Sequence, residues 1–312
     1  MPIIDMHCDT LIEMISKKKS LLKNDLKVSI GKLKEAHVIC QFFAMFIRLT
    51  DHDTLADAWN YMLTIYNKFV QEMDENPDSI KKVTSYNEIS RKQNKISAIL
   101  TLEEGGIIDD RLEKIDELYK MGVRLITLTW NFENCIGYPN SDEEQIMNAG
   151  LKPFGREVIE KMNDIGILID VSHLSDGGFW DIVKLSSKPF VASHSNSRTI
   201  KNARRNLTDP MLKVIADKGG VVGINFYNKF LGDSEIGTIS QMITHIKYIK
   251  KIAGIDVIAL GSDFDGFDSR CEIRDSSEFG KLVDLLKLNN FTFEEIEKIT
   301  YKNVMRVMKD VL

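Results

Sequence analysis

The chain has 312 residues, of which 43% are hydrophobic and 28% are charged, and its formal net charge is −5 at neutral pH. These values are typical of a soluble globular protein, and they give no electrostatic reason to expect nucleic acid or an anionic membrane as a partner. The four cysteines are widely spread without a C-x-x-C pair, which argues against a disulfide framework and a thiolate zinc site. With neither a basic leader pattern nor an apolar run of roughly eighteen residues, the sequence predicts a cytoplasmic protein.

Short apolar runs recur along the chain and alternate with helical patterns. The runs are rich in β-branched residues and nearly continuous, as in strands that a parallel sheet buries on both faces. Amphipathic helices are indicated at residues 53–73, 154–166, 211–220 and 239–254, and residues 292–312 indicate one or two closing helices. The predicted strands are residues 2–9, 38–47, 96–104, 123–130, 166–173, 189–194, 220–227 and 257–266.

This alternation predicts an α/β fold of the (β/α)₈ type, a TIM barrel, in preference to an open doubly wound sheet. We expect residues 1–312 to form a single barrel domain with closing helices at its C-terminus. Neither a GxGxxG nor a GxxxxGK[ST] motif stands between a strand and a helix, so nucleotide binding has no local support.

Imidazole and carboxylate groups stand where several predicted strands end, which is where barrel enzymes place their catalytic residues. Three of the six histidines, His7, His173 and His194, occupy such ends. His7 and Asp9 are two residues apart, so both side chains leave the first strand on one face. Burying so many charges without a cation would be costly. The other carboxylates at strand ends are Glu103, Glu104, Asp263 and Asp265.

These side chains predict a metal centre. Imidazole and carboxylate ligands without a thiolate suit Zn²⁺, with Mn²⁺, Co²⁺ and Fe²⁺ as competitors. The ligands are too many for one open catalytic zinc, and they suit two ions about 3.5–4 Å apart that share a carboxylate. Because such a pair acidifies a bridging water and polarises a carbonyl, the pattern predicts metal-assisted hydrolysis.

Seven segments carry a resemblance to a known family: "IDMHCDTL", "LEEGG", "LTLTWN", "DVSHLS", "ASHSNSR", "ARRNLTD" and "GSDFDG". They occur in the order seen in the membrane (renal) dipeptidase family, the M19 metallopeptidases, and the resemblance spans nearly the whole chain. It implies a (β/α)₈ barrel with two zinc ions that hydrolyses free dipeptides and tolerates a D-residue at the C-terminal position. It also implies a homodimer.

The resemblance implies a metal-ligand set. The glutamate directly before Gly-Gly, Glu104, resembles the carboxylate that bridges the two zinc ions, and we expect strand alternation to turn Glu103 toward the opposite face. His7 and Asp9 resemble ligands of one zinc, and the two other histidines resemble ligands of the second. The implied metal ligands are therefore His7, Asp9, Glu104, His173 and His194.

The resemblance also implies substrate-binding residues. Arg205, the second arginine of "ARRN", would grip the dipeptide carboxylate through its bidentate guanidinium. Asp263 would serve as the acid–base group and meet the free amine of the substrate. Trp130 stands where family members carry a histidine that contacts the substrate, and its indole N–H can donate one hydrogen bond.

Two alternatives stay open at the level of the sequence. The departure at Trp130 leaves room for a binuclear metal amidohydrolase that acts on another amide or a lactam. A non-catalytic metal-binding barrel is the second alternative, and the intact set of matched ligand positions argues against it.

Overall fold

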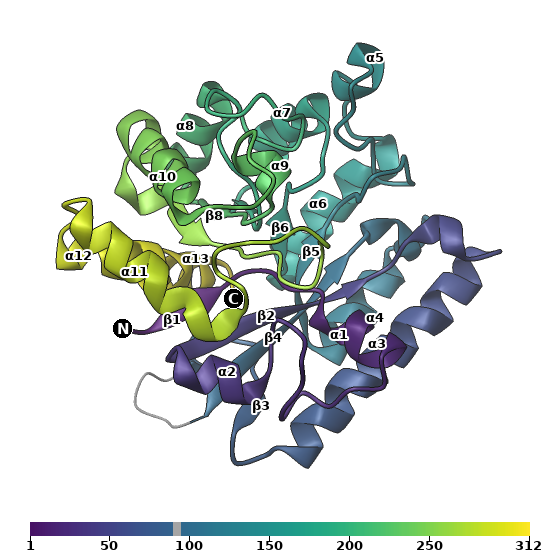
Figure 1. Ribbon diagram of the computed structural model, residues 1–312. Helices are drawn as coiled ribbons and strands as arrows, with labels where there is room; N and C mark the ends of the chain where they lie inside the picture. Colours follow the sequence, from purple (N-terminus) through teal and green to yellow (C-terminus); the bar gives the residue numbers. More distant parts are fainter. Residues whose placement is uncertain (90–94) are drawn as a thin grey trace.

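The computed structural model describes residues 1–89 and 95–312. Its strands form one parallel sheet in the order β2-β1-β9-β8-β7-β6-β5-β4-β3, and a further pairing of β2 with β4 closes an eight-stranded barrel (Figure 1). The predicted TIM barrel is therefore confirmed. The barrel strands are β1 (Ile3–Asp5), β2 (Val38–Phe46), β4 (Ile96–Glu103), β5 (Val123–Thr127), β6 (Leu168–Asp170), β7 (Val191–Ala192), β8 (Val221–Ile224) and β9 (Ile258–Leu260).

Each of the eight predicted apolar runs contains one barrel strand, and every strand is shorter than its run. Most of the difference arises at the C-terminal ends, where the polar residues leave the sheet and enter loops. An additional strand, β3 (Ile80–Lys82), pairs with the first residues of β4. It was not predicted because it is three residues long and two of them are lysines.

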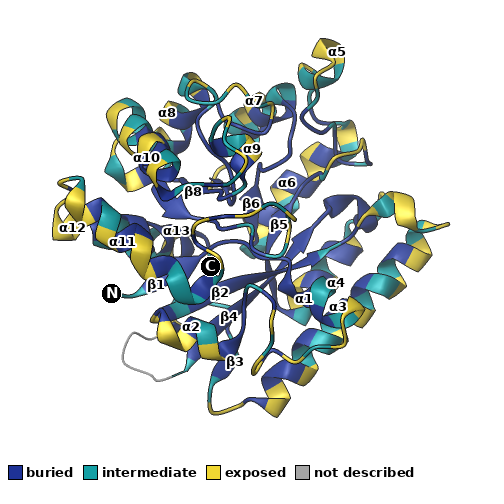
Figure 2. Cartoon of the chain, viewed as in Figure 1, coloured by how far each residue is buried: buried dark blue, intermediate teal, exposed yellow. Residues whose placement is uncertain are grey.

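Helices surround the barrel, with exposed residues on their outer faces and buried residues toward the strands (Figure 2). Their ends carry the expected caps: Thr54 accepts a hydrogen bond from the amide of Asp57 at the start of α3, and Gly166 ends α6 with a left-handed φ of 78°. The α-helices are α1 (Thr10–Ser16), α2 (Ile30–Glu35), α3 (Leu55–Glu75), α4 (Glu113–Met121), α5 (Glu144–Met147), α6 (Pro153–Ile165), α7 (Asp176–Leu185), α8 (Asp209–Asp217), α9 (Asn228–Leu231), α10 (Ile239–Ala253), α11 (Phe279–Leu288), α12 (Phe293–Glu297) and α13 (Asn303–Val311).

Two layers of apolar side chains fill the fold because successive residues of a strand face opposite sides of the sheet. On β4, Leu100 and Leu102 belong to the outer layer beneath the helices, whereas Ile99 belongs to the inner layer inside the barrel. The last helix, α13, packs against the inner layer and so closes one end of the barrel. Its inner-layer residues are Val304, Val307, Met308 and Val311.

Within the described ranges, none of the helices combines the length and the apolar character that crossing a lipid bilayer requires.

The closing role of α13 can be tested by truncating one buried side chain. Met308 is fully buried in the inner layer, and its replacement by alanine should lower the free energy of unfolding by about 2–5 kcal/mol, because a cavity is left at the barrel end. Lys309 follows it on the same helix and is exposed, so Lys309→Ala should change that free energy by less than about 0.5 kcal/mol. Chemical denaturation of both variants measures the difference, and equal values would show that α13 does not close the core.

Candidate active site

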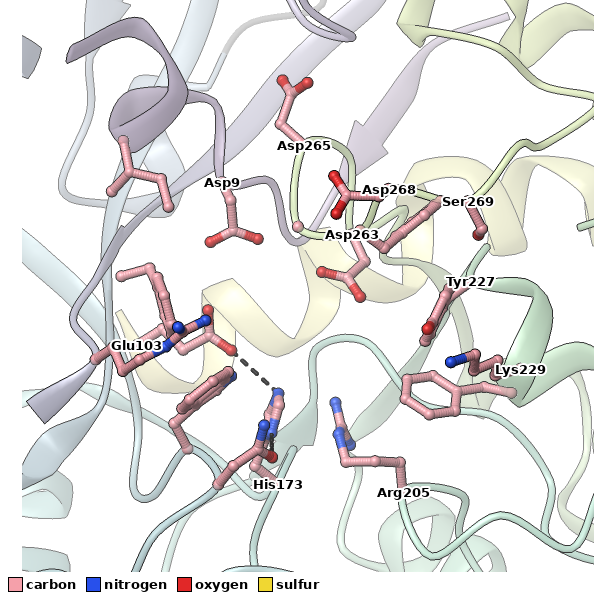
Figure 3. A pocket seen from close by; sticks show the side chains of 18 of the residues that line it. Asp9, Glu103, His173, Arg205, Tyr227, Lys229, Asp263, Asp265, Asp268 and Ser269 are labelled. Atoms are coloured by element: carbon pink, nitrogen blue, oxygen red, sulfur yellow. Dashed lines mark hydrogen bonds and ion pairs between the residues drawn. The ribbon is translucent and has the colours of Figure 1, made fainter. Parts of the chain in front are cut away.

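Three histidines converge on the carboxylate of Glu103, the last residue of β4 (Figure 3 shows Glu103 and His173). The Nε2 atom of His7 lies 3.3 Å from Oε2 of Glu103. On the other side, Nε2 of His173 lies 3.1 Å from Oε1, and Nε2 of His194 lies 3.6 Å from the same oxygen. Asp9 joins the first side, with its Oδ2 atom 3.3 Å from Nε2 of His7. Each oxygen of Glu103 therefore faces a different group of side chains.

Glu104 lies outside this cluster. Its Oε1 atom accepts hydrogen bonds from the amide of Gly106 at 2.7 Å and from Nδ2 of Asn134 at 2.5 Å, and its Oε2 atom accepts one from the amide of Trp130 at 3.0 Å. The bonds from Trp130 and Asn134 tie the loop after β4 to the loop after β5. The structure therefore corrects the prediction for Glu104: it is Glu103, and not Glu104, that lies between the histidines.

Strand alternation explains this correction. Ile99 faces the barrel interior, so Glu103, four residues later on the same strand, faces the interior as well. Glu104 falls on the side of Leu100 and Leu102, and its backbone has a positive φ of 99°, which turns the chain away from the strand. Both faces of β4 are buried and apolar, so the sequence does not reveal which of them is the inner one.

Left-handed backbone at other strand ends aims further polar side chains into the same region. His173 has a φ of 70° and Asp263 a φ of 62°, backbone conformations that residues other than glycine rarely adopt. Among the bonds that hold the ends of β1 and β9 together, one runs from the amide of Asp263 to the carbonyl of His7 and another from the amide of Asp9 to the carbonyl of Phe264. These bonds place the carboxylates of Asp9 and Asp263 on one side of the site.

Two buried aspartates, Asp5 and Asp170, link neighbouring strand ends through hydrogen bonds. Asp5 accepts hydrogen bonds from the amide and hydroxyl of Ser262, each at 2.7 Å, and from Nε2 of Gln41 at 2.9 Å. Asp170 accepts bonds from the amide and hydroxyl of Ser193, at 2.8 and 2.6 Å, and from the hydroxyl of Thr127 at 2.7 Å. Asp170 was not singled out from the sequence. The recurrence of Ile-Asp shortly before a histidine, in "IDMH" and "IDVSH", was a signal for it.

Hydrogen bonds to the far ring nitrogens orient two of the histidines. Nδ1 of His173 lies 3.0 Å from Oδ1 of Asn131, and Nδ1 of His194 lies 2.8 Å from the hydroxyl of Ser193, which donates to Asp170. When Nδ1 of His173 donates to the amide oxygen, its Nε2 atom carries the lone pair that a metal requires. Asn131 was likewise not singled out from the sequence.

The cluster opens into a cavity of about 750 Å³. Arg205 and Asp263 both line it, and their side chains point into it from different sides (Figure 3). The guanidinium of Arg205 is buried, contacts the carbonyl of His194 at 3.2 Å, and lies 5.4 Å from the ring of Phe230. Its Nε atom has no hydrogen-bond partner in the described part of the chain. Trp130 forms part of the wall beside the ring of His173.

The buried charges shift one another's pKa values. Burial raises the pKa of Glu103 to about 8, and it raises the pKa of Asp263 to about 6. Burial opposes the charged form of His7, but the carboxylates of Glu103 and Asp9 outweigh it and hold the pKa of His7 well above its usual value. Burial, together with the neighbouring cations, lowers the pKa of His173 and of His194 well below the usual value.

The donor set fits divalent metal ions. Among residues 1–89 and 95–312, three groups of ligand atoms have all their members within 4.8 Å of one another. Two of these groups share Glu103: one contains His7 and Asp9, the other His173 and His194. Oδ1 of Asp9, a buried anionic oxygen, has no hydrogen-bond partner among the described residues. A cation between these groups would supply the partner that the buried carboxylates need.

Comparison with known proteins places the chain in a family. The model of the family described as membrane dipeptidase, peptidase family M19, matches residues 1–312. The chain belongs to this family. The predicted resemblance is therefore confirmed, and membership supports dipeptidase activity and implies a metal.

Three relatives illustrate the similarity. An uncharacterized protein in the pqqA 5′ region of Klebsiella pneumoniae is 34% identical over 71% of this chain and 84% of its own length. An uncharacterized dipeptidase of Schizosaccharomyces pombe is 29% identical over 98% of this chain and 80% of its own length. The crystal structure of a metallopeptidase from Rhodobacter sphaeroides, bound to a phosphinate mimic of the dipeptide L-Ala-D-Ala, superposes with a TM-score of 0.91 at 21% identity, covering 100% of this chain and 99% of that one. This likeness shows the shared fold.

Metal uptake by this site should release protons. Because the pKa of Glu103 lies near 8 and that of His7 is raised, the pair retains a proton at pH 7 that a cation must displace. Affinity should fall as the pH is lowered, by about tenfold per pH unit for each proton displaced. Calorimetric titration of the metal-free protein with Zn²⁺ in buffers of different ionisation enthalpy measures the number of protons released per ion bound. Zinc uptake without proton release at pH 7 would contradict the assignment of Glu103 and His7 as metal ligands.

Proposed function

We propose that the protein is a zinc-dependent dipeptidase that hydrolyses free dipeptides at a binuclear centre built on Glu103. The observation that carries the proposal is the position of this carboxylate, with one oxygen toward His7 and the other toward His173 and His194. A carboxylate shared in this way is typical of two-metal hydrolases.

The proposed ligands fall into two sets. His7, Asp9 and Glu103 would hold one ion, and His173, His194 and Glu103 would hold the other. When bound, the ions would polarise the peptide carbonyl and make a bound water more acidic. Asn131 and Ser193 keep the rings of His173 and His194 in the orientation that binding requires.

Arg205 and Asp263 would bind the charged ends of the substrate. The guanidinium of Arg205 suits the α-carboxylate because it offers a planar pair of donors, and its uncommitted Nε atom is available for this contact. Asp263, across the cavity, would accept hydrogen bonds from the free amine. A longer peptide would leave one of these buried charges unmatched, so the pair restricts the substrate to dipeptides.

Asp263 would also transfer the proton. Its Oδ2 atom is held by Nδ2 of Asn225 at 2.9 Å, while Oδ1 lies 3.9 Å from Nε2 of His7, toward the centre. In this position the carboxylate can take a proton from the attacking water and deliver it to the nitrogen of the scissile bond, which then leaves as a neutral amine.

Trp130 offers no basic nitrogen, so we assign it a role in shaping the cavity and binding the substrate. Its ring packs edge-on against Phe46, with 4.9 Å between the ring centroids, and lies 6.2 Å from the ring of His173. The L-Ala-D-Ala mimic held by the Rhodobacter sphaeroides protein supports including dipeptides with a C-terminal D-residue among the substrates.

We also propose a cytoplasmic location and a homodimeric state for the enzyme. All four cysteines are free, which suits the reducing conditions of the cytoplasm. We further propose that residues 1–312 act as one catalytic unit and that two copies form a homodimer, as the family resemblance implies. Sedimentation analysis of the purified protein tests the homodimer.

Restoring metal to stripped protein tests the proposed activity. Hydrolysis of L-Ala-L-Ala and L-Ala-D-Ala should return with about two equivalents of Zn²⁺ per chain. The C-terminal amide of each dipeptide should be cleaved at least roughly tenfold less efficiently, because Arg205 then loses its charged partner. Arg205→Met should remove this discrimination by lowering the kcat/KM of the free dipeptide. A protein that binds two metal ions and cleaves none of these peptides would contradict the proposal.

The adjacent glutamates provide a matched pair of variants for the metal site. Glu103→Gln should lower the zinc content from two ions to one or none per chain and abolish hydrolysis, because an amide is a poor ligand for two cations. Glu104→Gln should retain both ions, since the hydrogen bonds of that side chain within the described structure go to two backbone amides and Asn134. Zinc analysis of the two purified proteins gives the answer, and loss of metal from Glu104→Gln alone would return the bridging role to Glu104.

A further inference from the structure

The cavity contains more charged side chains than the proposed reaction uses. Asp9 and Glu103 are assigned to the metal ions, and Arg205 and Asp263 to the ends of the dipeptide. Of the other charged residues that line the cavity, two acidic residues already have partners elsewhere in the structure. Glu13 pairs with Lys17, and Asp265 accepts hydrogen bonds from the hydroxyl of Thr10 at 2.6 Å and from the amide of Lys27 at 3.0 Å. The charges that remain without a role are Arg48, Lys229 and Asp268.

Arg48 is the one of these residues that the structure holds beside the reaction centre. Its guanidinium carbon lies 5.1 Å from the centroid of the Trp130 ring, within the range of a cation–π contact. The same ring is supported by Phe46 and lies next to the metal-ligand candidate His173. The stack therefore fixes a positive charge on the cavity wall, although the side chain of Arg48 is about half exposed (48%).

The hydrogen-bonding capacity of Arg48 is largely unused. Its nearest carboxylate in the described ranges is that of Asp51, whose Oδ2 atom lies 4.0 Å from Nε, and both side chains are exposed. A pair at this distance in solvent contributes little. The two terminal nitrogens form no hydrogen bond with any residue that the structure describes. A stacked guanidinium with free terminal nitrogens is suited to binding a carboxylate through two parallel bonds.

We propose that Arg48, stacked on Trp130, forms a subsite for an acidic side chain on the first residue of the dipeptide. This inference rests on the proposed dipeptidase function and names a preferred substrate class, dipeptides that begin with aspartate or glutamate. Trp130 then acts as a platform for the selecting cation.

The order of the strands assigns the subsite to the first residue. Asp263 follows β9, Asp9 follows β1 and Arg48 follows β2, and these three strands are neighbours in the barrel. Arg205 follows β7, which lies on the other side of β9. Arg48 is therefore on the side of the cavity where Asp263 would hold the free amine. The side chain nearest to that amine belongs to the first residue of the substrate.

Lys229 is the competing candidate and serves as the control. It lines the opposite wall together with Tyr227, near Arg205 (Figure 3). Its Nζ atom lies 5.8 Å from the Tyr227 ring, and no carboxylate oxygen of the described residues lies within 4.0 Å of it. Lysine is flexible and presents a hydrated point charge, so it is less able to select a carboxylate by geometry.

The test compares two substrates of nearly equal size, L-Asp-L-Ala and L-Asn-L-Ala, with zinc-loaded protein. The kcat/KM for the aspartyl dipeptide should exceed that for the asparaginyl dipeptide by roughly tenfold at low ionic strength, and the ratio should shrink as salt is added. Arg48→Met should bring the ratio to about one, and Arg48→Lys should restore part of it. Lys229→Met should leave the ratio as in the wild type. L-Ala-L-Asp and L-Ala-L-Asn, compared in the same way, should show no effect of Arg48→Met.

Several outcomes would overturn the subsite. These are a wild-type ratio near one, a preference that survives in Arg48→Met, a preference that Lys229→Met abolishes, and an Arg48-dependent preference confined to the second residue. Failure of the proposed function can be distinguished from failure of the subsite. If the protein does not hydrolyse the two peptides, calorimetry still measures how tightly it binds each of them. Tighter binding of L-Asp-L-Ala that Arg48→Met removes would support the subsite even if no dipeptide were cleaved. Equal binding would overturn it.

Discussion

The structure depends on one constraint: several ionisable side chains must be buried together where the strands of the barrel end. Glu103 meets His7 on one side and His173 on the other, and each of these groups is less than one-tenth exposed. Such a cluster is unfavourable in an apolar interior unless the charges are compensated. The raised pKa of Glu103 and the lowered pKa of His173 are two consequences of the same desolvation. Binding of cations would remove the conflict, so the property that destabilises the metal-free site is the one that would give it metal affinity.

The cluster keeps its geometry because the strand ends are fastened to one another by buried polar groups. Asp5 joins β1 to residues that follow β9, and Asp170 joins β6 to β7 through Ser193. Strand β7 has only two residues, so the sheet itself offers few hydrogen bonds to locate His194. The bonds of Asp170 and Ser193 take over that task. This arrangement explains why short strands can support an ordered site and why several apolar runs of the sequence, such as residues 2–9 and 166–173, are longer than the strands they contain.

The sequence predicted the barrel and most members of the cluster, because apolar periodicity and the position of polar residues at strand ends are local signals. It predicted that Glu104 faces inward, whereas Glu103 does. That choice depends on the face of β4 that lines the barrel, and Leu100 on the outer face is as apolar as Ile99 on the inner one. Asn131 was missed for a related reason, since its partner, His173, is 42 residues away in the sequence and meets it only after the barrel closes.

Trp130 lines the cavity but does not belong to the groups of candidate metal ligands. The backbone amide of Trp130 is held by Glu104, so the loop is anchored independently of what the side chain does. The side chain forms part of the cavity wall, where it packs against Phe46 and contacts the guanidinium of Arg48. An aromatic ring at this position binds no proton, but it can orient a cation that a smaller or charged residue would leave mobile. In the proposed enzyme, the inward-facing residues at the strand ends would carry out the reaction, and the loops after β2 and β5 would determine the choice of substrate.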